Sequence, residues 1–246
     1  MSDFVELWVY LSSTPLFGLT ATLVVYILWH ALYVRVDQNP LLNPVLWSIL
    51  VIAGTLWVTG VSYQTYFSGA QFIHFLLGPA VVALAWPLWL RRQQLKSRMG
   101  RLLIAATLGG AVASLSAVAL ALILDLPEQV VLSLVPKSVT APVAMGISES
   151  IGGIPALSAV FSVLTGLVGA LTGKYVFEFL RIPKDVQGWT DRGFAMGTVS
   201  HGIGAARAIQ VNPDAGAYAG LALGLQVVIA SLLIPGVFRL LGWLHP

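Results

Sequence analysis

Apolar segments of about 20 residues recur along this chain, each bounded by a short polar stretch. The clearest are at 16–34, 44–62, 72–90, 102–124, 154–172 and 218–237. One α-helical crossing of a bilayer needs about 20 such residues, and in lipid only helices or closed barrels satisfy their own backbone. The chain is 57% hydrophobic and 9% charged, whereas soluble domains carry roughly 25% charged residues. We therefore expect an all-α polytopic membrane protein with about seven to eight membrane segments, forming a single transmembrane domain over residues 1–246.

Residues 136–153 break this pattern with the sequence PKSVTAPVAMGISESIGG, which carries Lys137 and Glu149. Irregular backbone survives at membrane depth only where protein covers it or water reaches it, and ionisable groups there mark a functional site. We predict that the segment 128–151 is discontinuous or re-entrant. It should contain a short helix near 128–135, an unwound piece at Val135–Thr140, and a second short helix.

The basic loops predict an orientation. Residues 91–101 hold five cations and no acid, so this loop should be cytoplasmic and the N-terminus outside. Residues 174–192 hold four cations and three acids and should also be cytoplasmic. Two full crossings between residues 128 and 174 would place the loop 174–192 outside. One segment must therefore enter the membrane and return to the same side. The alternative is that this weakly basic loop carries no topological information.

Interrupted segments occur in both halves of the chain. The first half, 1–125, contains one at 72–90, and the second half, 126–246, contains two, at 128–151 and 193–209. Residues 76–88 and 134–145 both place a proline after an apolar pair and a second proline soon after. This pairing suggests an inverted repeat with a binding site where the breaks meet, although prolines also kink ordinary membrane helices. The expected breaks are Pro79, Pro87, Pro136, Pro142, Gly152, Gly153, Gly202 and Gly204.

Small residues at spacings of four predict close helix packing. Gly169 and Gly173 form one such pair, and Gly216, Gly220 and Gly224 form a longer series. Because lipid supplies no hydrophobic drive for helix association, such glycines let two helix backbones approach.

The motifs in the interrupted segments of the second half contain the ionisable residues Lys137, Glu149, His201 and Arg207. Hydroxyls accompany them at Ser138, Thr140 and Ser200. Broken helices direct free N–H groups and the positive end of their dipoles at the break, and arginine can hold a carboxylate with two hydrogen bonds. We expect Lys137, Ser138, Thr140, Ser200 and Arg207 to bind a small carboxylate. Glu149 or His201 would then carry a coupling proton or complete an ion pair.

Simpler roles remain open for the same residues. Lys137 and Arg207 could neutralise Glu149 in a buried pair, Lys137 could extend to an interface, and His201 could only bridge two helices. His30 and His74 lie near segment ends, as interfacial residues do.

Other function classes are not expected. The chain has no cysteine and no metal-ligand spacing, and adjacent Ser200 and His201 do not make a hydrolase. We therefore expect no enzyme activity, cofactor, metal or nucleic-acid partner. The N-terminus shows neither a removable signal peptide nor an organelle leader, which favours a bacterial cell membrane.

Four motifs resemble the LrgB/CidB family of bacterial membrane proteins. They are LLGPAVVALAWPL at 76–88, PKSVTAPVA at 136–144, SESIGGIPALSAVFSVLTG at 148–166 and GTVSHGIGAARA at 197–208. The resemblance covers roughly residues 60–236. Val81, Ala141 and Ala205 stand where family members often carry a hydroxyl, which puts substrate selectivity in doubt.

The resemblance implies two functions. One is secondary transport of small carboxylates such as glycolate, glycerate or pyruvate, because a similar plant plastid protein is a glycolate/glycerate translocator. The alternative is an antiholin-like regulator of murein hydrolase export and autolysis, acting with a small LrgA/CidA-type partner. The resemblance also implies the fold of an inverted-repeat carrier with broken helices. It places the protein in the bacterial inner (cell) membrane. Exact substrate, coupling ion and homo-oligomerisation are left open by the sequence.

Overall fold

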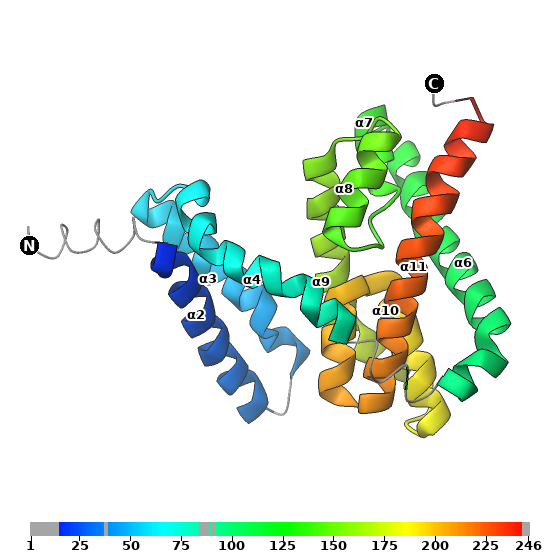
Figure 1. The fold of residues 1–246 in the computed structure, drawn as a ribbon, viewed down its shortest axis with the longest axis horizontal. Coiled ribbons are helices and arrows are strands. Elements are labelled where there is room, and N and C mark those ends of the chain that lie inside the picture. Colours follow the sequence, from blue (N-terminus) through cyan, green and yellow to red (C-terminus); the bar gives the residue numbers. More distant parts are fainter. Residues whose placement is uncertain (1–14, 37–38, 84–88, 90–91, 243–246) are drawn as a thin grey trace, which may run out of the picture. The chain divides into compact units, whose positions relative to one another are not determined.

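The computed structural model describes residues 15–36, 39–83, 89 and 92–242, and these are helices joined by turns (Figure 1). The chain divides into two compact units, residues 1–83 and 84–246. The expected single transmembrane domain stays a prediction.

Unit 1 contains α2 (Pro15–Arg35), the short 3-10 helix η1 (Pro40–Leu42), α3 (Pro44–Thr59) and α4 (Tyr63–Ala83). The side chain of Asn43 caps α3 by accepting hydrogen bonds from the backbone N–H groups of Val45 and Leu46. Gly18 brings α2 against the backbone of Tyr66 in α4, and the hydroxyls of Thr22 and Tyr66 are 2.7 Å apart.

The predicted interruption at 72–90 is wrong at Pro79. Helix α4 continues through this proline to Ala83. A proline removes one hydrogen bond from a helix, which neighbouring turns of a membrane helix can tolerate. The second expected break of this segment, Pro87, lies outside the described residues.

Unit 2 contains the longer helices. In chain order these are α6 (Arg92–Ile123), α7 (Glu128–Leu134), α8 (Ala141–Ser150), α9 (Pro155–Phe179), α10 (Val186–Val211) and α11 (Pro213–Leu240). In Figure 1, α7 and α8 gather at the upper end of this unit and α10 at the lower end, while α6 and α11 run between them.

Four of the described helical stretches are long and apolar enough to cross a membrane. They are Leu16–Arg35, Lys96–Ile123, Pro155–Phe179 and Pro213–Leu240; α3 is apolar but shorter. Along α9, Val160, Leu164 and Val168 recur every fourth residue with about half of each side chain exposed, which is the pattern of a lipid-facing stripe. The protein is thus a multi-pass membrane protein, and the total of seven to eight segments stays a prediction.

The predicted discontinuity at 128–151 is observed. Helix α7 ends at Leu134 and α8 begins at Ala141, so six residues of turn separate them at the predicted position. At about 1.5 Å per residue, neither short helix could span a bilayer core.

The chain after α8 returns to the end of α7. Ile154 donates its backbone N–H to Ser133 Oγ at 2.8 Å, and Ser158 Oγ donates to the carbonyl oxygen of Ser133 at 2.8 Å. Gly152 has a φ of 84°, and a Cβ on Gly153 would lie 3.0 Å from the backbone nitrogen of Ser133. The chain from α7 through the break to the end of α8 therefore goes out and returns, a path that we call the α7–α8 hairpin, and α9 starts from the level of Ser133.

Helix α10 also doubles back. His201 interrupts it with φ 39° and ψ −132°. A Cβ added to Gly204 would lie 2.7 Å from the carbonyl oxygen of Met196, eight residues earlier, whereas residues this far apart in a straight helix are about 12 Å apart along its axis. The arm before His201 and the arm after it thus lie side by side, and Ile209 on the returning arm packs on Gly216 of α11.

Glycines set the spacing between α9, α10 and α11. On α9, Gly166, Gly169 and Gly173 face His201, Ser200 and Met196 respectively, with no room for a larger residue. Gly193 and Gly197 of α10 lie against the carbonyl groups of Ala215 and Ala219. The packing roles predicted for Gly169, Gly173 and Gly216 are confirmed, whereas Gly224 has nothing within 4 Å of an added Cβ.

The basic segment expected at 174–192 is largely helical. Helix α9 extends to Phe179 and α10 begins at Val186, so the connection is only the residues between them. Asp185 caps α10 by accepting from the N–H of Gly188 at 2.7 Å.

Candidate functional site

The first interruption, residues 135–140 between α7 and α8, contains polar residues directly before the start of α8. Helix α8 begins after Thr140, whose side chain makes no capping bond, and Pro142 occupies its first turn. Ser138 is only 2% exposed, and its hydroxyl has no hydrogen-bond partner among the described residues. Uncapped N–H groups at a helix start can be satisfied by a ligand.

The second interruption is centred on His201. A positive φ is unusual for a residue with a side chain and costs of order 1–3 kcal/mol, so the surroundings must hold it. Gly202 follows immediately and has open space around it. The returning arm of α10 begins here, and its first N–H groups lie at this break.

Ser162 of α9 joins the two interruptions. Its Oγ donates to the carbonyl oxygen of Val139 in the first interruption at 2.5 Å. The imidazole Nε2 of His201 lies 2.7 Å from the carbonyl oxygen of Ser162 and 3.3 Å from its Oγ. Because a carbonyl oxygen only accepts, Nε2 carries the proton in this contact. Two breaks that are far apart in the sequence therefore meet on one buried serine.

The sequence did not single out Ser162. Serine in an apolar helix often bonds its own preceding turn, so its presence alone carries little information. Ser158 and Ser162 are nevertheless both fully buried and four residues apart. A polar pair on one face of an otherwise apolar helix was the available signal.

The charged residues of the predicted site lie on different parts of unit 2. Lys137 is half-buried in the first interruption, and the structure gives its ammonium no partner within its described residues. Glu149 is exposed near the end of α8 and has no basic group within 4 Å in the described part of the chain. Arg207 is half-buried on the returning arm of α10. Thr140 is half-buried and Ser200 is buried.

Six of the predicted helix breaks belong to unit 2. Pro136 lies inside the first interruption, and Pro142 lies in the first turn of α8. Gly152 and Gly153 form the turn after α8. Gly202 and Gly204 lie within the returning arm of α10, where His201, rather than a glycine, carries the non-helical torsion.

A cavity of about 340 Å³ adjoins the first interruption, between α6, residues 135–139 and α11. Ser138 lines it, and so does Gln226, which is 5% exposed. The Gln226 Oε1 has no partner in the described structure, and the amide packs directly on Gly110 of α6. Gln226 was not predicted from sequence, because one amide in an apolar helix does not reveal what it faces.

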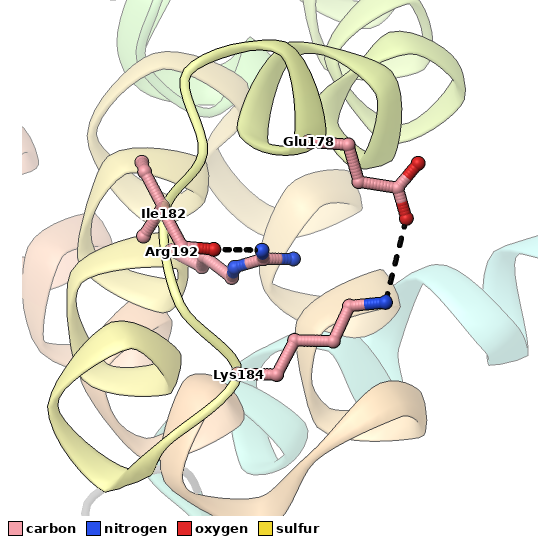
Figure 2. Close-up of polar contacts among 4 residues, drawn as sticks. All are labelled: Glu178, Ile182, Lys184 and Arg192. Carbon is pink, nitrogen blue, oxygen red and sulfur yellow. Dashed lines mark hydrogen bonds and ion pairs between the residues drawn. The ribbon is translucent and has the colours of Figure 1, made fainter.

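Arg192 closes the connection between α9 and α10 and was also assigned no role by sequence. Figure 2 shows its guanidinium donating to the carbonyl oxygen of Ile182. The guanidinium carbon lies 5.2 Å from the ring of Trp189 and 5.6 Å from that of Phe177. In the same view Lys184 and Glu178 form an exposed salt bridge of 3.5 Å. Arg192 is therefore a structural cation at the end of unit 2 opposite the α7–α8 hairpin.

Comparison with known proteins identifies the family. The profile described as the LrgB-like family matches residues 22–240. An uncharacterized protein of Haemophilus influenzae is 34% identical over 220 residues, which is 89% of this chain and 94% of the relative. A Staphylococcus aureus protein named holin-like protein CidB is 32% identical over 198 residues, covering 80% of this chain and 84% of the relative. The uncharacterized protein YwbG of Bacillus subtilis is 32% identical over 218 residues, covering 89% and 95%.

No solved structure matches the chain. The family profile covers most of the sequence, and the motifs at both interruptions lie inside the matched range. The chain therefore belongs to the LrgB-like family of membrane proteins.

Proposed function

We propose that this protein is a secondary carrier of small carboxylates, of the glycolate, glycerate or pyruvate type, in a bacterial cell membrane. The observation that carries the proposal is the convergence of two chain breaks on Ser162, through Val139 on one side and His201 on the other. Discontinuous helices that meet at mid-depth are the usual construction of substrate sites in transporters.

The contacts support a topology with two hairpins entering from opposite sides of the membrane. The α7–α8 hairpin starts after α6 and returns to Ser133, where α9 departs. The α10 hairpin starts after α9 and returns to Ile209, beside the beginning of α11. Only α9 would then cross between residues 128 and 186. The segment 91–101, predicted as a cytoplasmic loop, is helical from Arg92 onward as the basic start of α6. This start and the α9–α10 connection would lie on the same, cytoplasmic, side, and crossings by α2, α3 and α4 would place the N-terminus outside.

This arrangement also suggests an inverted repeat inside unit 2. Residues 128–179 and 186–240 each comprise a short helix, a break, a second short helix and a long helix that begins at a proline, Pro155 or Pro213. The pairing differs from the 76–88 with 134–145 match expected from sequence. Alternating access would follow from moving these hairpins relative to the rest of the protein.

The chemistry at the breaks suits a small anion. The uncapped start of α8 and the start of the returning α10 arm both present N–H groups and positive dipole ends. Lys137 and Arg207 would supply full positive charge, and Thr140 and Ser200 neutral hydrogen bonds. Glu149 or His201 would carry a coupling proton; for His201 this requires breaking its contact with Ser162.

Uptake into proteoliposomes tests this function. Purified protein should give saturable accumulation of labelled glycolate, glycerate or pyruvate when a proton gradient is imposed. Arg207→Leu and Lys137→Gln should each lower uptake by about 10- to 100-fold, the value of a hydrogen bond to a charged group. Lys184→Ala is the matched control, because this lysine is exposed in the α9–α10 connection. Absence of flux for all three acids, or full uptake by Arg207→Leu, would contradict the proposal.

The relatives named holin-like support a second candidate, a regulator of autolysis that acts with a small LrgA/CidA-type partner. A pore or pore regulator should release solutes without saturation and without selectivity for carboxylates. Release of an uncharged dye from the same vesicles, at a rate independent of carboxylate concentration, would favour this candidate over the carrier.

A further inference from the structure

The cavity between α6 and α11 has mostly apolar walls and four polar lining residues, Thr107, Ser114, Ser138 and Gln226. Ser138 Oγ and Gln226 Oε1 both lack partners in the described structure, and both residues line the cavity. The walls around them are made by Val135, Val139 and a series on α11 that includes Ile229 and Leu233. Burying an unpaired hydroxyl and an unpaired amide is costly, so a ligand that bonds both would recover that energy.

The depth of these groups limits what the ligand can be. Gln226 lies in the middle of α11 (Pro213–Leu240), and it packs on Gly110, in the middle of α6 (Arg92–Ile123). Ser114, one turn further along α6, donates to the carbonyl oxygen of Val135 at 2.7 Å, which ties the first interruption to the same level. A phospholipid headgroup or ester lies at the membrane interface and would not reach mid-depth.

The charge of the cavity limits the ligand further. None of the described residues that line it is ionisable. An anion would have to leave water without a counter-charge, whereas a neutral polar group needs only hydrogen bonds. The cavity volume of about 340 Å³ is roughly that of eleven water molecules in the liquid, but apolar walls do not hold water well. A molecule with one neutral polar end and a short apolar body fits these walls.

We infer that this cavity binds a monocarboxylic acid in its undissociated form, with the acid's O–H donated to Gln226 Oε1 and its carbonyl oxygen accepting from Ser138 Oγ. Both partnerless groups are then satisfied by one ligand. The choice of an acid rests on the proposed carrier function, but binding in the cavity is measured separately from transport.

Equilibrium binding of hexanoic acid and of hexanamide to the purified protein in detergent tests the inference. Hexanamide has an N–H donor and a carbonyl acceptor at the positions of the acid's O–H and carbonyl oxygen, and it does not ionise between pH 6 and pH 8. Since carboxyl groups titrate near pH 4, the undissociated fraction of the acid falls about tenfold for each pH unit above 6. The apparent affinity for hexanoic acid should therefore fall about a hundredfold between pH 6 and pH 8, while that for hexanamide stays constant.

Variants of the two polar groups locate the binding. Ser138→Ala and Gln226→Leu should each weaken hexanamide binding by about three- to tenfold, the worth of one neutral hydrogen bond. Ser116→Ala is the matched control, because Ser116 is exposed on α6 and does not line the cavity. Ser138→Ala removes a hydroxyl that has no partner, so it should fold at least as well as the parent.

The outcomes separate this site from the carrier proposal. No hexanamide binding by the parent, equal binding by the parent and both variants, or hexanoic acid binding that does not weaken with pH would overturn the inference. Hexanamide binding without any carboxylate flux would keep the cavity site and reject the carrier. Flux that persists in Gln226→Leu after hexanamide binding is lost would keep the carrier and place its transport site elsewhere.

Discussion

Replacing Gly169 by alanine tests whether the glycine face of α9 holds the second chain break in place. An added Cβ would lie 2.8 Å from Cβ of Ser200, and closer still to the Ser200 hydroxyl. Carbon atoms in favourable contact are about 3.5–4.0 Å apart. Helices α9 and α10 would therefore have to separate by roughly 1 Å beside His201, and overpacking of this kind costs about 1–3 kcal/mol.

Helix propensity has to be separated from packing, because alanine is the better helix former by about 1 kcal/mol. Gly224→Ala provides that correction, since Gly224 is also inside a helix and has nothing within 4 Å of an added Cβ. The unfolding free energy of Gly169→Ala, measured by titration with a denaturing detergent, should be about 1–3 kcal/mol below that of Gly224→Ala.

A second substitution on α10 should rescue the first. With Ser200→Gly the nearest remaining atom to the new methyl group is the residue-200 Cα, at 3.9 Å, an ordinary contact. The double variant Gly169→Ala/Ser200→Gly should therefore recover about 1–3 kcal/mol as a coupling energy. Ser200→Ala should rescue only in part, because its Cβ remains. A coupling energy near zero would show that α9 and α10 do not meet at these residues and would refute the reasoning.

Two further predictions concern the ends of α10 and α11. Asn212→Ala should lower the unfolding free energy by about 1 kcal/mol in the same titration, because its side chain accepts from the N–H groups of Asp214 and Ala215 at the start of α11; an unchanged value would contradict this capping role. Arg192→Lys should lower the melting temperature measurably, because an ammonium cannot reproduce the guanidinium's stacking on nearby rings together with its bond to a buried carbonyl, whereas Lys184→Ala in the same loop should stay near the parent.

The local interruptions could be predicted from the sequence because their causes are local. Pro136, Lys137 and Pro142 within a few residues cannot form a continuous lipid-facing helix, and the structure breaks the helix there. Pro79 was misjudged for the opposite reason. A single proline with no charged residue or second proline close by removes one backbone hydrogen bond, and a membrane helix can tolerate that loss. Helix α4 therefore continues past Pro79.

Which interrupted segments correspond to each other in a repeat could not be predicted from local sequence. The sequence suggested a match between 76–88 and 134–145, whereas the repeat that we propose from the order of helices in unit 2 pairs 128–179 with 186–240. Proline spacing is a weak marker, since it reports where a helix is disturbed and not which way the chain runs afterwards. The reversal of α10 at His201 depends on Gly166 of α9, which leaves room for the histidine ring.

From residue types alone, the chain had to be helical, to lie in a membrane and to be broken near 135–140, because backbone groups in lipid have no other way to be satisfied. Which polar groups meet was decided only by folding. Ser162 bonds Val139 and His201, which are 23 and 39 residues distant along the chain, and Gln226 faces a cavity formed with Ser138 from another helix connection. Such contacts depend on how close two helices can approach, and that distance is set by the glycines and side chains of both helices together.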